Sequence, residues 1–117
     1  MPDVRLNLLK KKIQQFRDER DWKQFHNPKD LAVSISIEAA ELLEHFQWRT
    51  PEQSDKKVHN DRDKIAEEMA DVYIYLLELS DITGIDLIEA TEKKIEKNAK
   101  KYPVEKSKGN SKKYTEL

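Results

Sequence analysis

Two stretches of this chain carry apolar residues at helical spacing on more than one side. The first, residues 28–48, has Leu31, Ile35, Leu42 and Phe46 on one side and Val33, Ile37 and Leu43 on another. The second begins near Ile65 and ends before Gly84, a residue suited to terminate a helix. A helix that is apolar on several sides must be covered on several sides. We therefore expect these two helices at the centre of the fold.

Two further helices are predicted from apolar residues at helical spacing. One covers residues of about 4–20, and the other follows a cap at Asp86 and runs to about Lys101. Residues 52–60 are polar and are expected to form an exposed connection. With only two Gly and four Pro, the chain favours long helices over β structure. The sequence thus predicts an all-α fold, an antiparallel four-helix bundle assembled as a dimer or a dimer of dimers.

The length of 117 residues suits a single domain. Residues 1–103 are predicted to form the helical domain, and residues 104–117 have too little apolar content to fold alone and are predicted to be a flexible C-terminal tail. No apolar run approaches the length of about 18 residues that a membrane span needs, and the N-terminus lacks an apolar signal segment. We therefore expect a cytoplasmic protein without a membrane partner.

Opposite charges nearly cancel in this chain, although 38% of its residues are charged. The 22 Lys and Arg and 23 Asp and Glu give a formal net charge of −1 at pH 7. Because no overall field draws such a chain to polyanions, no nucleic-acid partner is expected. The absence of Cys excludes disulfides and thiolate metal sites.

Two pairs of acidic residues, three positions apart, interrupt the central apolar stretches: Glu38 with Glu41, and Glu68 with Asp71. Residues at that spacing share one face of a helix, so each pair brings two like charges together. Neither Glu38 nor Glu41 has a Lys or Arg four positions away to relieve the repulsion. If the two helices pack together, four carboxylates converge, and such an all-oxygen set suits Mg²⁺ or Mn²⁺ better than Zn²⁺. The alternative is a pair of solvated acidic faces.

The acid pairs and the motifs around them resemble the MazG-like all-α nucleoside triphosphate pyrophosphohydrolases, in particular their deoxycytidine triphosphate pyrophosphatase branch. The motifs that carry the resemblance are Arg20-Asp-Trp22 with Phe25-His26 and Pro28, Phe46-Gln-Trp48, Asp71-Val-Tyr-Ile-Tyr75-Leu, Asn98 with Tyr102-Pro103, and Lys113-Tyr-Thr-Glu-Leu117. They span nearly the whole chain from about residue 10. The resemblance implies Mg²⁺-dependent hydrolysis of a nucleoside triphosphate, dCTP or a modified dCTP, to the monophosphate and pyrophosphate.

The resemblance also implies roles for individual residues. Glu38, Glu41, Glu68 and Asp71 would hold the metal, and Glu38 or Glu41, with a slight preference for Glu41, would activate the attacking water. The predicted substrate contacts are Trp22 and Trp48 as walls of a base pocket, His26 near that pocket, Tyr75 and Tyr102 beside the phosphates or sugar, and Lys94, Asn98 and Lys101 on one face of the fourth helix. The alternatives are core positions for the aromatic residues, a structural role for His26, and a solvated basic face for Lys94, Asn98 and Lys101.

One position departs from the family pattern. Ile13 stands where related proteins carry a His that faces the base, nine residues before the first Trp, which weakens the carry-over of cytosine selectivity.

Two other functions compete with hydrolysis. The chain could instead be a non-catalytic helical oligomerisation or interaction module. A di-iron bundle would need Glu-x-x-His motifs, and none of the three His, at 26, 45 and 59, lies three positions after a Glu.

Overall fold

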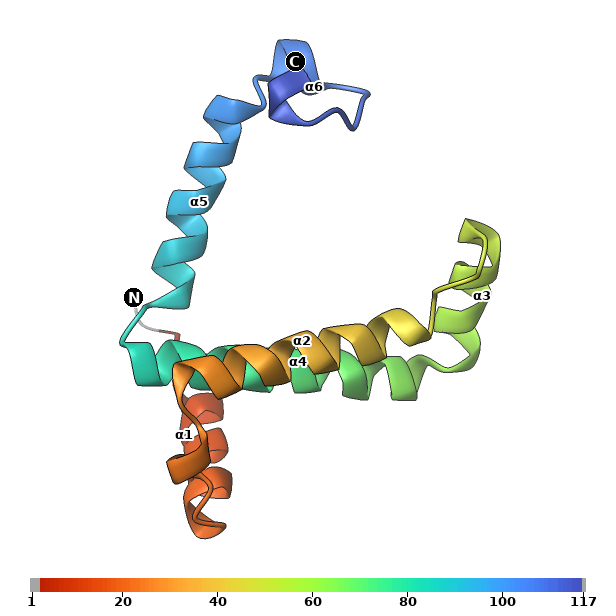
Figure 1. Ribbon diagram of the computed structural model, residues 1–117. Helices are drawn as coiled ribbons and strands as arrows, with labels where there is room; N and C mark the ends of the chain where they lie inside the picture. The colour runs from red at the N-terminus through yellow and green to blue at the C-terminus, as the bar shows by residue number, and fades with distance from the viewer. Residues whose placement is uncertain (1–2, 117) are drawn as a thin grey trace. The chain divides into compact units, whose positions relative to one another are not determined.

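The computed structural model describes residues 3–116, and all of their regular structure is helical (Figure 1). The elements are α1 (Val4–Glu19), the 3₁₀ helix η1 (Lys23–Phe25), α2 (Pro28–Glu44), α3 (Pro51–Asn60), α4 (Arg62–Thr83), α5 (Leu87–Lys101), α6 (Val104–Ser107) and the 3₁₀ helix η2 (Tyr114–Glu116). This confirms the predicted all-α class. The chain divides into two compact units between Gly84 and Ile85, and each is described by itself.

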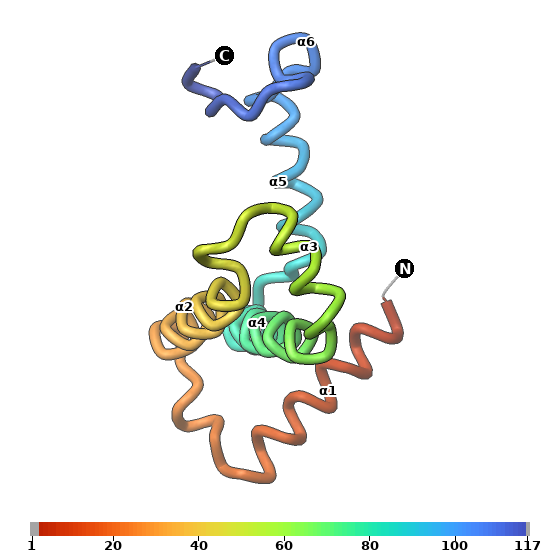
Figure 2. The backbone as a smooth tube through the Cα atoms, turned by 90° about the vertical axis from the view of Figure 1, so that its right-hand side faces the viewer, coloured from red at the N-terminus to blue at the C-terminus, as the bar shows by residue number. Residues whose placement is uncertain are grey.

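In the first unit, α4 is the central element and contacts α1, α2 and α3. Helices α2 and α4 lie side by side in both views (Figures 1 and 2), and Figure 1 shows that they run in opposite directions. Leu31 of α2 and Ile65 and Leu77 of α4 are buried in this unit. The predicted centre of the fold is therefore confirmed. None of the helices within residues 3–116 has the combined length and apolar character needed to cross a bilayer.

Local side-chain chemistry sets the helix ends that the sequence predicted. The Asn27 side chain accepts a hydrogen bond from the backbone N–H of Asp30, with Pro28 as the first helical residue of α2. Gly84 ends α4 in the left-handed region, at φ 70°. Asp86 caps α5 by accepting from the backbone N–H of Glu89.

Helix α3 corrects the prediction that residues 52–60 form only an exposed connection between helices. Thr50 and Gln53 form a reciprocal capping box, and Pro51 occupies the first helical position. These residues define the start of a helix, although the polar segment lacks the apolar stripe from which the other helices were predicted. In addition, α2 ends at Glu44 and is followed by a turn, rather than continuing to residue 48.

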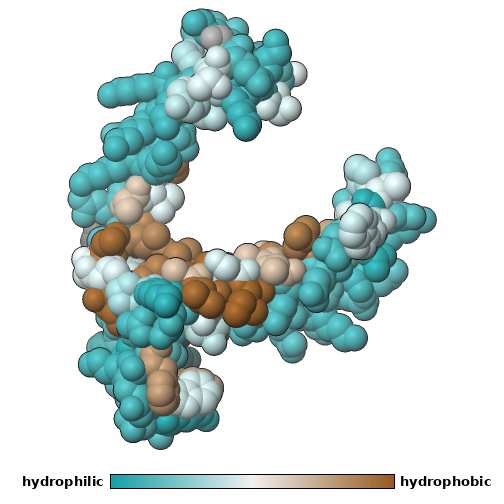
Figure 3. Space-filling view, viewed as in Figure 1, coloured by the Kyte–Doolittle hydropathy of each residue, from teal (hydrophilic) through white to brown (hydrophobic). Residues whose placement is uncertain are grey.

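Apolar side chains remain exposed along the first unit. On α2 and α4 they include Val33, Ile37, Leu43, Met69 and Tyr73. Figure 3 shows apolar surface gathered along this helix pair. The second apolar side of α2, predicted from the sequence, is therefore not covered within the first unit.

The second unit consists of α5, α6 and η2. Tyr102 and Tyr114 meet edge to face, with ring centroids 6.2 Å apart, and the Lys101 ammonium lies 4.9 Å from the Tyr114 ring centre. The predicted domain limit at residue 103 and the flexibility of residues 104–117 stay predictions, as does the place of α5 in a four-helix bundle. Met1, Pro2 and Leu117 lie outside the described residues.

Candidate metal centre

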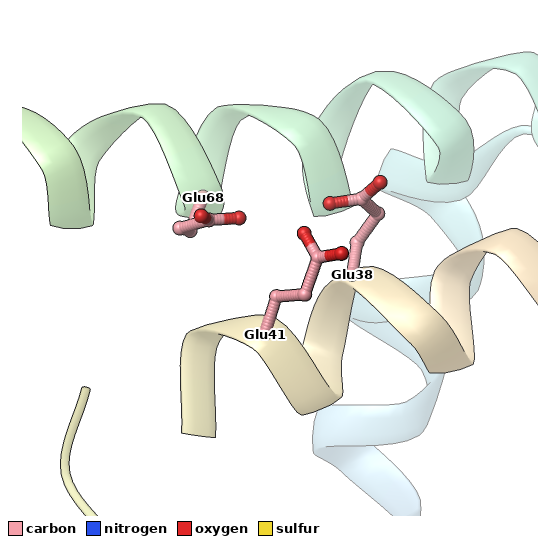
Figure 4. A group of neighbouring side chains, drawn as sticks. All are labelled: Glu38, Glu41 and Glu68. Carbon is pink, nitrogen blue, oxygen red and sulfur yellow. The ribbon is translucent and has the colours of Figure 1, made fainter. Parts of the chain in front are cut away.

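Three of the four predicted acids meet between α2 and α4. One carboxylate oxygen from each of Glu38, Glu41 and Glu68 lies within 4.8 Å of the others. Figure 4 shows the first two projecting from α2 toward the third on α4. The spacing of three residues on α2 places Glu38 and Glu41 on one helix face, and the antiparallel packing brings Glu68 opposite them. We call these three residues the acid cluster.

Asp71, the fourth predicted ligand, is not part of the group of oxygens within 4.8 Å. It lies one turn after Glu68 on α4 and is close enough for its charge to raise the pKa values of Glu38 and Glu68. It also lines the pocket beside the cluster. Its role as a metal ligand stays a prediction.

The electrostatics of the acid cluster favour a bound positive charge. Burial, a hydrogen bond with Glu41 and the charges of neighbouring acids together raise the pKa of Glu38 to about 7. Burial and Glu41 also raise the pKa of Glu68, against a smaller opposite effect of His45. The cluster therefore binds a proton more tightly than an isolated carboxylate does.

Buried oxygens in the cluster offer ligands to a cation. Among the described residues, Oε2 of Glu38 and Oε2 of Glu68 have no hydrogen-bond partner although both atoms are buried. Such oxygens are costly to bury unless something binds them. A set composed only of carboxylate oxygens fits a hard divalent cation such as Mg²⁺ or Mn²⁺. The residues present therefore fit the metal that the sequence predicted.

A pocket of about 340 Å³ lies beside the cluster. Its lining comprises Lys12, Ile13, Phe16, Trp22, His26, Asp71, Ile74, Tyr75 and Glu78. Three predicted substrate contacts, Trp22, His26 and Tyr75, are thus brought together. Asp71 and Tyr75 connect the pocket with the acids, because each interacts electrostatically with Glu38. We call this cavity the aromatic pocket.

Aromatic contacts organise this pocket. The Trp22 ring meets Phe16 edge to face with centroids 5.8 Å apart, and the His26 ring meets Tyr75 in the same manner at 6.3 Å. Burial and the charges of Glu38, Glu78 and Asp71 raise the pKa of Tyr75. Its hydroxyl therefore stays protonated at neutral pH and can donate a hydrogen bond.

Other predicted contacts lie elsewhere in the chain. Trp48 is the last residue of the turn after α2, is 94% exposed and is not among the residues that line the aromatic pocket. Lys94, Asn98 and Lys101 lie on α5, and Tyr102 caps its C-terminal end, so all four belong to the second unit. Their contacts with substrate stay predictions.

Sequence reasoning missed two charged residues next to the aromatic pocket. Glu78 of α4 and Arg17 of α1 are 5% and 4% exposed, respectively. The signal that singled out Glu38 also applies to Glu78, which has Ile74 and Ile82 four positions away and no basic residue there. The same rule, applied to single acids as well as to pairs, would have found it.

Comparison with known proteins connects this geometry to a family. A protein named dCTP pyrophosphatase 1 from Bos taurus is 39% identical over 105 residues, which are 88% of this chain and 62% of the bovine protein. The protein of the same name from Homo sapiens is 36% identical over 118 residues, 99% of this chain and 69% of the human protein. The chain thus spans somewhat less than two thirds of the bovine relative and slightly more than two thirds of the human one.

A solved structure agrees with these relatives. The crystal structure of a pyrophosphatase from Archaeoglobus fulgidus superimposes with a TM-score of 0.83 at 46% identity, covering 88% of this chain and 96% of that chain. The model of the MazG-like family matches residues 33–117, a range that contains the acid cluster and Asp71. This agreement confirms the resemblance drawn from the motifs, and the chain belongs to the MazG-like family.

Proposed function

We propose that this chain is a Mg²⁺-dependent nucleotide pyrophosphohydrolase that converts a deoxynucleoside triphosphate, dCTP or a modified dCTP, to the monophosphate and pyrophosphate. The observation that carries the proposal is the acid cluster, with its partnerless buried oxygens, at the side of an aromatic pocket. The names of the bovine, human and archaeal relatives support the same reaction class. Mn²⁺ is the alternative ion for the same ligands.

The acid cluster would bind the metal ion and would also accept a proton from the attacking water. Glu38, Glu41 and Glu68, with Asp71 beside them, would hold the cation, which when bound neutralises triphosphate charge and acidifies water. Water attacks the α-phosphorus, forming a new phosphorus–oxygen bond, while the bond from that phosphorus to the α–β bridging oxygen breaks. Glu41 accepts the proton of the water, and pyrophosphate leaves. Glu38 would be the other candidate for this base.

The aromatic pocket would bind the rest of the nucleotide. Trp22 offers an indole face for stacking with a base, and Tyr75 offers a hydroxyl donor on the side nearer the acids. Lys94, Asn98, Lys101 and Tyr102 of the second unit are proposed to contact phosphates or sugar, and Trp48 is proposed as a second wall for the base.

We further propose that the protein acts as a homodimer or homotetramer in the cytoplasm, without a nucleic-acid or membrane partner. The exposed apolar side chains of α2, Val33, Ile37 and Leu43, support subunit pairing because burying them stabilises an assembly. The nearly neutral charge balance offers no general attraction to polyanions.

Product identification tests the proposed reaction. Purified protein incubated with Mg²⁺ and dCTP should yield dCMP and pyrophosphate, separated by anion-exchange chromatography. The appearance of dCDP and orthophosphate would contradict the assigned bond cleavage. If no product forms and calorimetry detects no binding of Mg²⁺, a non-catalytic interaction module would be favoured instead.

A further inference from the structure

A buried charged group lies at one wall of the aromatic pocket. It consists of Glu78, which lines the pocket, with His26 and Arg17 near it. The His26 Nδ1 atom lies 3.2 Å from Oε1 of Glu78, a charge contact that does not have the geometry of a hydrogen bond, and the two side chains are 15% and 5% exposed. Arg17 contacts Asp18 at 2.9 Å and Asp81 at 3.7 Å.

Packing stability does not account for this group. Burial raises the pKa of Glu78, while the nearby His26 and Arg17 act in the opposite direction. Among the described residues, its second oxygen, Oε2, is buried without a hydrogen-bond partner. Apolar side chains of similar volume would fill such a position at no electrostatic cost. A buried carboxylate at the wall of a ligand pocket therefore points to a role in binding.

The contact with Glu78 determines what His26 can offer a ligand. A carboxylate at Nδ1 favours the ring form that carries its proton on that nitrogen. In the neutral ring the other nitrogen, Nε2, then has a free electron pair and can only accept a hydrogen bond. Glu78 thus determines whether Nε2 of His26 accepts or donates a hydrogen bond.

Part of the pocket wall is apolar. Ile13 lines it and can make no hydrogen bond. Asp71 and Tyr75 lie toward the acid cluster, which we assign to the phosphate end of the substrate. His26, packed edge to face against Tyr75, is positioned to read the base.

We propose that Glu78 is a positioning residue that holds His26 with its proton on Nδ1, so that Nε2 accepts a hydrogen bond from the exocyclic amino group of a cytosine base. Uracil presents a carbonyl oxygen at the same place, and two acceptors repel each other. The Glu78–His26 pair thereby supplies base selectivity that Ile13 does not. This inference deepens the proposed function and rests on it.

The primary experiment compares dCTP with dUTP in the wild type and in Glu78→Gln. The Gln amide can present its NH₂ group to Nδ1, which moves the ring proton to Nε2 and turns the acceptor into a donor. The ratio of kcat/KM for dCTP over dUTP should fall by about tenfold, the scale of one hydrogen bond with its unsatisfied partner.

Asp81→Asn is the matched control. It removes a carboxylate on the same helix that faces the same arginine but does not line the aromatic pocket. The base ratio of this variant should equal that of the wild type. An unchanged ratio in Glu78→Gln, or an equal loss in Asp81→Asn, would overturn the proposal and leave Glu78 as a structural residue.

His26→Ala keeps the proposal testable if Glu78→Gln does not fold. The substitution lies in the segment that joins η1 to α2 and leaves α4 unchanged. It should cause a similar loss of base selectivity, and the double variant should lose no more than His26→Ala alone, since both changes remove one interaction. Additive losses, or normal selectivity in His26→Ala, would contradict a Glu78–His26 pair.

A binding measurement separates this inference from the proposed function. Calorimetric titration with dCMP and dUMP needs no hydrolysis, and the wild type should favour dCMP while Glu78→Gln should not. If the wild type shows this preference but releases no pyrophosphate from dCTP, the proposed reaction fails and the pair stands. If pyrophosphate is released but the two monophosphates bind alike in every variant, only the inference about the pair fails.

Discussion

Glu38 and Glu78 are both acids of the central helices whose pKa is raised by burial, but their neighbours have opposite charges. Glu38 faces other carboxylates, Glu41 and Glu68, and their charges raise its pKa further. Glu78 lies near His26 and Arg17, which act against the rise. The two sites therefore differ in where compensating positive charge comes from.

This difference separates a site that needs an external cation from a site that carries its own. The acid cluster can relieve its repulsion by binding a proton or a metal ion. Glu78 already has a positive charge near it in the Arg17 guanidinium of α1. Substitutions at the two sites should consequently differ in their response to Mg²⁺.

The largest effect is expected for Glu41→Gln in the acid cluster. Turnover of dCTP should fall by about 10³-fold, because the substitution removes a metal ligand and the proposed base while keeping the side-chain shape. The helical circular dichroism should be unchanged. Glu44→Gln, an exposed acid one turn later on α2, is the control and should retain activity. Equal activity of the two variants would remove Glu41 from the catalytic site.

Arg17→Met should destabilise the protein by about 3 kcal/mol, because it leaves Glu78 buried with less positive charge near it. Denaturant unfolding measures the loss, with Lys11→Met on the exposed part of α1 as control. Saturating Mg²⁺ should not restore the stability that Arg17→Met removes. Full rescue by Mg²⁺ would mean that the two sites are not separate.

Mg²⁺ itself should stabilise the metal-free wild type by about 2.7 kcal/mol at a concentration of about 100 times Kd. The measurement is thermal unfolding over a Mg²⁺ series, at pH 8. Glu41→Gln should show a much smaller gain. A wild-type melting temperature independent of Mg²⁺ would argue for solvated acids instead of a metal centre.

The smallest effect concerns the stability of the metal-free protein as a function of pH. The pKa of Glu38 is about 7 in the folded state, above its ordinary value of 4.5, so the folded protein binds more protons than the unfolded chain between these values. Stability should therefore fall as pH rises from about 4.5 to 7, and Glu38→Gln should flatten this dependence. A contribution from Glu38 that rises with pH would contradict the raised pKa.

The helices could be predicted where the sequence carries an apolar stripe or a cap. Asn27, Gly84 and Asp86 set helix ends by local hydrogen bonds and backbone preference, which a sequence displays directly. Helix α3 was missed because its polar residues show no stripe, although Thr50 and Gln53 form its capping box. Capping residues therefore predicted where helices begin and end more reliably than polar composition predicted which segments are loops.

The candidate site was predictable to the extent that it depends on spacing along one helix. Glu38 and Glu41 share a face by their separation in sequence, and like charges without basic neighbours marked them. The approach of Glu68 across the helix pair, the distance of Asp71 from the group and the exposure of Trp48 depend on tertiary packing. Glu78 was missed because it is a single acid.

The raised pKa of Glu38 has a consequence for how the proposed enzyme would respond to its surroundings. A carboxyl that is half protonated near neutrality must release its proton when a divalent cation binds. The proton and the cation therefore compete for the Glu38 carboxylate. Acidification of the medium would then displace the metal ion and slow catalysis while the helices remain folded.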